Sequence, residues 1–177
     1  MFKKGLLCVV LMFGLSACVP IIVGGAVAAT VYVVHDSRTP ADRKVDAHIQ
    51  EAIQNKLNAI SDVKTRCHIV VSVFHGNVLL AGQAPTDDLR AQIQKAVSDV
   101  AGIVRLYNEI QIEAPNSKLT RMSDSWISTK VRYKIKRDKT LQDPAVQLIT
   151  ENGTVYLMGQ VQPGDANKIA VLASKVS

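Results

Sequence analysis

One eight-residue segment occurs twice in this chain of 177 residues, and it limits the possible architecture more than any other feature. GNVLLAGQ at 76–83 and GTVYLMGQ at 153–160 agree in five of eight positions, 77 residues apart. In each copy a turn containing glycine leads into an apolar segment, which predicts a hairpin of two strands. We therefore expect two copies of one small domain.

The first copy reads helix, strand, strand, helix, strand. RKVDAHIQEAIQNKL has apolar residues every four positions, which predicts one buried helix face, and either Asp42 or Thr39 can cap its start. CHIVVSVF alternates like a half-buried strand, and IVRLYNEIQI supplies a third strand. The residues predicted in this core are Val45, Ile49, Ile53 and Leu57, then Cys67, Ile69, Val71 and Val73, then Leu89, Ile93, Ala96, Val97 and Val100.

The second copy repeats this order as far as its second helix. No counterpart of IVRLYNEIQI precedes Ser177, so we expect this sheet to lack its last strand and suspect a truncated or frameshifted reading frame. The predicted fold is α+β, with two tandem αββαβ domains at 41–113 and 124–177, the second C-terminally incomplete, and a polar linker at 114–123. Its predicted core comprises Ile127, Val131, Ile135, Val146, Leu148, Ala166, Ile169, Ala170, Ala173 and Val176.

The N-terminus has the features of a bacterial lipoprotein. Residues 1–17 form a predicted signal peptide, with Lys3 and Lys4 before a short apolar segment. Leu15-Ser16-Ala17-Cys18 matches a lipobox, in which the thiol of Cys18 is diacylated before cleavage makes it the first residue. Residues 18–40 are then an acylated, apolar tether.

A signal anchor is the alternative for this region. Gly5 to Val34 is apolar and long enough to cross a bilayer core of about 30 Å. Pro20 and Gly24-Gly25 interrupt that stretch, which favours the lipoprotein. Two acyl chains would hold the protein stably at a membrane.

The net charge indicates the class of partner. Without residues 1–17 the chain keeps 19 of its 21 cations against 15 anions, a net charge of +4. A lipid-anchored basic protein is expected to meet a phospholipid surface, and we expect no nucleic acid partner.

Cys67 is the only thiol left beside Cys18, so it forms no internal disulfide and is expected to be a packed apolar residue.

The first helix of the second copy combines aromatic and cationic residues on one flank. DSWISTKVRYKIKRD has five cations and two anions, whereas ADRKVDAHIQEAIQNKL in the first copy has three of each and no aromatic residue. Because both helices serve the same fold, the difference is not needed for folding. Such a mixture suits the headgroup region of a membrane. The candidate phospholipid-binding residues are Trp126, Lys130, Tyr133, Lys134 and Arg137.

Other chemistry has little support in the sequence. The four histidines are scattered, and Cys67 and His68 are expected to point to opposite faces of a strand. We therefore predict no metal site, no cofactor and no enzymatic activity.

These motifs together resemble a known family. Two αββαβ repeats with G-x-V-x-L-x-G hairpins resemble BON domains. With the lipobox, LYNEI at 106–110 and DSWISTKVR at 124–132, the chain resembles the DolP-like family of dual-BON outer-membrane lipoproteins. The resemblance implies a non-enzymatic, periplasm-facing lipoprotein of a gram-negative outer membrane, where Val19 after the cysteine goes with outer-membrane sorting.

The same resemblance implies a function. Members bind anionic phospholipid through the first helix of the second BON domain, gather at division sites and support outer-membrane integrity, partly near the barrel-assembly machinery. A protein-interaction adaptor that uses the same helix, for barrel assembly or cell-wall remodelling, is the alternative. A packing module without a ligand is a third.

Overall fold

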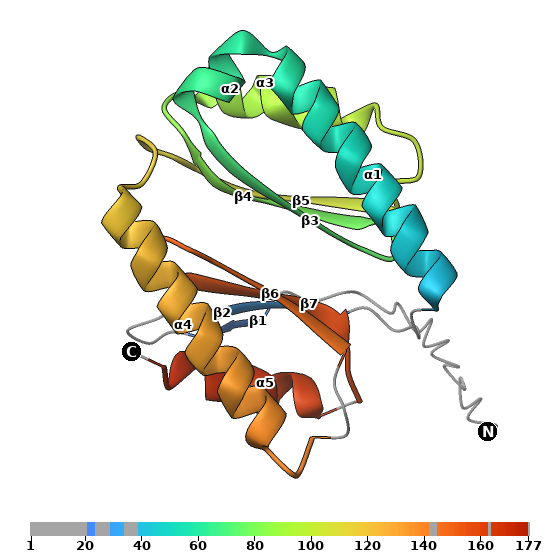
Figure 1. Cartoon of the computed structure of the whole chain (residues 1–177), viewed down its shortest axis with the longest axis vertical. Coiled ribbons are helices and arrows are strands. Elements are labelled where there is room, and N and C mark those ends of the chain that lie inside the picture. Colours follow the sequence, from blue (N-terminus) through green and yellow to red (C-terminus); the bar gives the residue numbers. More distant parts are fainter. Residues whose placement is uncertain (1–20, 24–28, 34–38, 142–144, 163, 177) are drawn as a thin grey trace, which may run out of the picture.

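The computed structural model describes residues 21–23, 29–33, 39–141, 145–162 and 164–176. It contains two units of helices on a sheet, and the two sheets face each other with the helices on the outer sides (Figure 1). The predicted α+β class and the two-domain organisation are confirmed. The predicted signal peptide and Cys18 lie outside the described residues.

The first domain follows the predicted order of elements with one addition, the short helix α2. Helix α1 starts with a capping box in which both predicted caps take part. The Thr39 hydroxyl accepts the Asp42 backbone N–H at 3.2 Å, and the Asp42 carboxylate accepts the Thr39 N–H at 2.6 Å. The elements are α1 (Pro40–Ala59), α2 (Ser61–Arg66), β3 (His68–Phe74), β4 (Asn77–Ala84), α3 (Asp87–Ser98) and β5 (Arg105–Ile112).

The first sheet has the strand order β3-β4-β5, with an antiparallel hairpin and a parallel third strand. His75 and Gly76 form the hairpin turn with φ of 51° and 70°, as a two-residue turn of this hand requires. The core matches the prediction except at Val45 and at Ala96, which is half-buried and lies outside the packed cluster. Val45 is exposed, and the neighbouring Asp46 points inward instead.

The second domain repeats these elements. Asn152 and Gly153 form its hairpin turn with φ of 50° and 73°, and the predicted core residues pack together. No strand follows α5 in the described residues. The elements are α4 (Lys118–Arg137), β6 (Ala145–Glu151), β7 (Thr154–Gln160) and α5 (Asp165–Ser174).

Two N-terminal strands that were not predicted extend the second sheet. β1 (Ile21–Val23) and β2 (Ala29–Val33) give the strand order β1-β2-β7-β6. β2 lies parallel to β7, and β1 lies antiparallel to β2. Part of the segment expected to be a simple tether is therefore strand, and β7 is not an edge strand (Figure 1).

An apolar cluster joins the two domains through their sheets. Phe74, Leu79 and Ala81 of the first sheet pack with Tyr156 and Met158 of the second, and all five are buried. Burial of these apolar side chains is the main contribution to the stability of the contact between the sheets.

Polar contacts surround that cluster. The Ser72 hydroxyl donates to the Gln147 side-chain oxygen at 2.7 Å. On another part of the interface the Glu151 carboxylate lies 3.4 Å from His68 Nε2 and accepts from Gln83. Apolar and polar contacts thus pack the two domains against each other.

Candidate functional site: the exposed face of α4

Helix α4 is longer than predicted. The Ser117 hydroxyl caps it by accepting the Thr120 N–H at 3.1 Å, so the helix begins at Lys118. Residues 118–123, which we assigned to the linker, are its first turns. Three cations lie in the last turn, where they complement the negative end of the helix dipole.

The inner face of α4 fixes its orientation. Ile127, Val131 and Ile135 are buried in the core of the second domain, as predicted. Asp124 is also buried, with 5% of its surface exposed. Its carboxylate accepts the backbone N–H groups of Asn152 at 3.0 Å and Gly153 at 2.8 Å, which ties the helix to the hairpin turn.

The outer face of α4 presents the predicted aromatic residues to solvent. Trp126 is 61% exposed and Tyr133 is 58% exposed. Leu119 and Met122 are exposed on the same side, two turns and one turn before Trp126. Neither residue was predicted, because the helix was expected to begin at Asp124 and it begins at Lys118. We call the following residues the α4 stripe: Leu119, Met122, Trp126, Lys130, Tyr133, Lys134 and Arg137.

Each aromatic ring of the stripe carries a cation one turn further along the helix. Lys130 Nζ lies 5.3 Å from the centre of the Trp126 ring. The Arg137 guanidinium lies 5.5 Å from the Tyr133 ring and donates a hydrogen bond to the Tyr133 hydroxyl. These are cation–π distances. The pairs keep positive charge and aromatic surface side by side on one face.

Lys134 also contacts the second helix of its domain. It is half-buried, as Lys130 is, and its Nζ donates to the Lys175 carbonyl oxygen at 2.9 Å. That carbonyl belongs to the C-cap of α5. Lys134 therefore joins α4 to α5 in addition to adding charge beside the stripe.

The equivalent face of α1 lacks these groups. His48 stands at the position of Trp126 and is exposed, and half-buried Ala52 stands at the position of Lys130. The exposed apolar residue on this face is Val45. The two helices hold the same place in their domains, so the contrast seen in the sequence persists at the surface.

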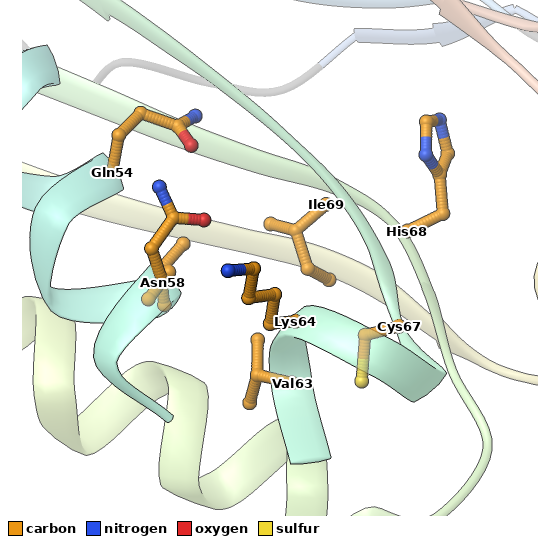
Figure 2. A pocket seen from close by; sticks show the side chains of 8 residues that line it. Gln54, Asn58, Val63, Lys64, Cys67, His68 and Ile69 are labelled. Carbon is orange, nitrogen blue, oxygen red and sulfur yellow. The ribbon is translucent and has the colours of Figure 1, made fainter. Parts of the chain in front are cut away.

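A shallow depression of about 180 Å³ lies beside Cys67 in the first domain. Figure 2 shows the Cys67 and His68 side chains pointing away from each other, as predicted. Burial raises the pKa of the Cys67 thiol, which disfavours a reactive thiolate. Gln54, Leu57, Asn58, Val63, Lys64 and Ile69 complete the lining.

Two further findings concern the described part of the chain as a whole. It contains no group of three or more histidine, cysteine, aspartate or glutamate residues arranged to hold a metal ion. None of its helices combines the length and the apolar character that crossing a membrane requires.

Comparison with known proteins identifies the family. Residues 45–114 and 123–177 match the BON domain. The chain is 32% identical to the outer membrane lipoprotein DolP of Haemophilus influenzae over 164 residues, which are 92% of this chain and 84% of the relative. It is 30% identical to a 21 kDa hemolysin of Actinobacillus pleuropneumoniae over 80% of this chain and 73% of the relative. The chain therefore belongs to the BON-domain family, as a DolP-like member with two BON domains.

Proposed function

We propose that this protein is an outer-membrane lipoprotein that contacts anionic phospholipid through the α4 stripe of its second BON domain. The exposure of Trp126 and Tyr133, each with a cation beside its ring, is the observation that carries the proposal. Leu119, Met122, Trp126 and Tyr133 are exposed on one face with cations beside them, and a group of exposed apolar residues bordered by polar ones is typical of a protein or membrane contact.

The energetics of the stripe suit a weak membrane contact. Tryptophan and tyrosine rings favour headgroup depth, and Leu119 and Met122 add apolar surface at the start of the helix. Each cation near an anionic surface contributes about 1 kcal/mol, and salt weakens this attraction. Weak affinity is sufficient because acylation at Cys18 would keep the domain beside the bilayer.

The test uses residues 18–177 with Cys18→Ser, so that the chain keeps β1 and β2 but carries no acyl group. Sedimentation with phosphatidylglycerol vesicles should show binding that falls with added salt. The double variant Trp126→Ala/Lys130→Glu should lose about tenfold or more in affinity. The matched control is His48→Ala/Lys44→Glu, which makes the same change of charge on exposed residues of α1. Equal binding by both double variants would remove the α4 stripe from the mechanism.

A photo-crosslinker at position 126 in cells tests the nature of the partner. Lipid adducts support the proposal. A discrete protein adduct would instead favour the adaptor, in which the α4 stripe docks on envelope machinery such as the barrel-assembly machinery.

The cellular part of the proposal is that lipid contact supports the integrity of the outer membrane, at division sites in particular. The protein would face the periplasm and act without catalysis. The name of the Haemophilus influenzae relative supports the outer-membrane location. Cells with Trp126→Ala/Lys130→Glu as their only copy should become sensitive to detergent while the protein level is unchanged. Normal resistance in these cells would contradict this role.

A further inference from the structure

A groove of about 390 Å³ lies between the two domains, where β3 of the first sheet contacts β6 of the second. Both strands are edge strands of their sheets. Three residues of β3 and four of β6 line the groove, together with Gln50 of α1 and Arg132 of α4. Its volume falls in the range of about 300–1,000 Å³ that is typical of ligand sites. The groove is separate from the α4 stripe and from the depression beside Cys67.

The hairpin register shows which backbone groups of β3 point toward this groove. Phe74 and Asn77 flank the two-residue turn and form a hydrogen-bonded pair, so every second residue of β3 bonds to β4. The residues between them direct their N–H and C=O groups away from the sheet. Ile69 and Val71 are two of these residues, and they present backbone donors and acceptors at the open edge of β3.

The matching edge of β6 is already partly covered. The Arg132 guanidinium donates to the Leu148 carbonyl oxygen at 3.1 Å, which agrees with an outward direction of that carbonyl. The equivalent residues of the first domain are Gln54 and Val71, and among the described residues Gln54 makes no such bond. The depression beside Cys67 reaches the same strand at Ile69. Because an open strand edge binds an added strand through main-chain hydrogen bonds, β3 is the better acceptor of the two.

Arg132 sets the charge of the groove. It is the charged residue of the described lining, which contains no carboxylate. Its side chain is exposed, and a guanidinium has five N–H donors, of which the bond to Leu148 uses one. The other donors suit a carboxylate, which arginine binds in a bidentate manner. The half-buried side chains of Val70, Val146 and Ile149 add apolar surface, which favours β-branched neighbours.

We propose that this groove binds an extended acidic segment of a partner protein, which adds as a fourth strand to the edge of β3 and pairs a carboxylate with Arg132. An added strand lies about 4.8 Å from β3, and facing sheets are about 10 Å apart. Side chains of an added strand alternate between two faces, so every second one points toward the second domain. An acidic side chain on that face lies within reach of the long Arg132 side chain.

The proposed site does not compete with the membrane for α4. Arg132 follows Trp126 by six residues, which places the two side chains about 120° apart around the helix. A partner in the groove therefore leaves the α4 stripe free. The inference does not depend on lipid binding, and it differs from an adaptor that uses the stripe itself.

A displayed library of random nine-residue peptides, selected against residues 18–177 with Cys18→Ser, tests the specificity. We expect the enriched peptides to be rich in β-branched residues and to share one aspartate or glutamate. Arg132→Glu should weaken binding of a selected peptide about tenfold or more. The same variant should prefer the peptide in which lysine replaces that acid, because the charges are then exchanged across the contact.

Lys136→Glu is the matched control for that variant. Lys136 is exposed one turn further along α4 and lies outside the groove lining, so the same change of charge should leave peptide binding within about twofold. Failure to enrich any peptide, or an equal loss in both variants, would overturn the proposal.

Strand addition also has a signature that needs no protein variant. Alternate residues of an added strand direct their N–H groups to β3. N-methylation of one alternate set of amides in the selected peptide should therefore weaken binding about tenfold or more, and methylation of the other set should be tolerated. Equal binding by the two methylated peptides would refute strand addition.

Hydrogen exchange measured by NMR identifies the edge that the peptide occupies. The amides of Ile69 and Val71 should exchange about tenfold or more slowly in the complex, and those of Val146 and Leu148 should not change. Protection along β6 alone would place the peptide on the wrong strand and contradict the proposal.

Analytical ultracentrifugation of the parent chain distinguishes a partner protein from a second copy. We expect a monomer, with the edge of β3 open to the peptide. A dimer that dissociates when the selected peptide is added would show that a second copy occupies this edge, and would overturn the assignment to a partner protein.

Discussion

Removing the carboxylate of Asp124 should destabilise the second domain. Asp124 is buried on the inner face of α4 and accepts two backbone N–H groups from the hairpin turn, at 2.8 and 3.0 Å. One of them belongs to Asn152, whose φ of 50° is uncommon for a residue other than glycine. The carboxylate thus holds both the turn and the position of the helix.

The expected loss follows from these two bonds. A hydrogen bond to a charged group contributes about 1.5–3 kcal/mol. The turn lies at the surface, where water can partly replace the acceptor, so Asp124→Ala should lower the free energy of unfolding by about 3 kcal/mol. Asp124→Asn keeps one acceptor and should lose about half as much. Because the two domains pack as one body of roughly 150 residues, 3 kcal/mol lowers Tm by about 6–12 °C.

Urea unfolding followed by circular dichroism measures these changes, and the amide signals of Asn152 and Gly153 report on the turn. The first domain repeats the arrangement, since Asp46 accepts the N–H groups of His75 and Gly76, both at 2.9 Å. Asp46→Ala should therefore cost a similar amount. Glu51→Gln, an exposed change on α1, should stay within about 0.5 kcal/mol of the parent. If Asp124→Ala is as stable as that control, the buried carboxylate does not hold the turn.

Three further predictions concern single sites. Burial between the two sheets raises the pKa of the Tyr156 hydroxyl from 10.0 to about 12. The protonated hydroxyl therefore contributes fully to stability below pH 10, and this contribution is lost as the pH rises toward 12. The variant Tyr156→Phe should show a smaller decline of stability over this pH range in urea titrations. Hydrogen bonds from the hydroxyl and the N–H of Thr140 lower the pKa of the Asp138 carboxyl group below its ordinary value of 3.8. The ionised carboxylate therefore stabilises the fold above pH 3.8, and this effect is lost in more acidic solution. The variant Thr140→Val should raise that pKa toward 3.8 in an NMR titration of the carboxyl group. A Cβ at Gly82, whose φ is 118°, would lie 2.0 Å from the His68 carbonyl oxygen, so Gly82→Ala should reduce the stability of the first domain by about 3 kcal/mol or more, and wild-type stability would contradict this reasoning.

Local patterns were sufficient to predict most of each domain. Spacing of four on the helices and alternation on the strands identified the two cores, because each pattern arises from the geometry of a single element. The turns at His75-Gly76 and Asn152-Gly153 were predicted for the same reason. Exposure of Trp126 also followed from the period of its helix once the buried face was known.

The errors involve contacts between elements. Val45 continues the apolar spacing of α1, but the hairpin turn beside it needs a carboxylate, so Asp46 points inward. A signal for this was present, because Asp46 and Asp124 each precede a core isoleucine by three residues. The helical start at Lys118 depends on a serine cap inside a polar segment that resembled a linker. β2 was missed because its apolar sequence also suits a lipoprotein tether, and its partner strand is more than 100 residues away.

The path of the chain explains why the two domains pack as one body. β2 belongs to the second sheet and precedes the first domain, and α4 returns to the second sheet after it. The first domain is therefore inserted between two parts of the second and is connected to it at both ends. Two short connections restrict how far the sheets can separate, which lowers the entropy lost when they pack. The small apolar cluster around Phe74 and Tyr156 is then sufficient to keep the two sheets packed. The helices of both domains lie on the outer sides of the sheets (Figure 1). This arrangement leaves the outer face of α4 exposed from Leu119 to Tyr133, as a membrane contact through that helix requires.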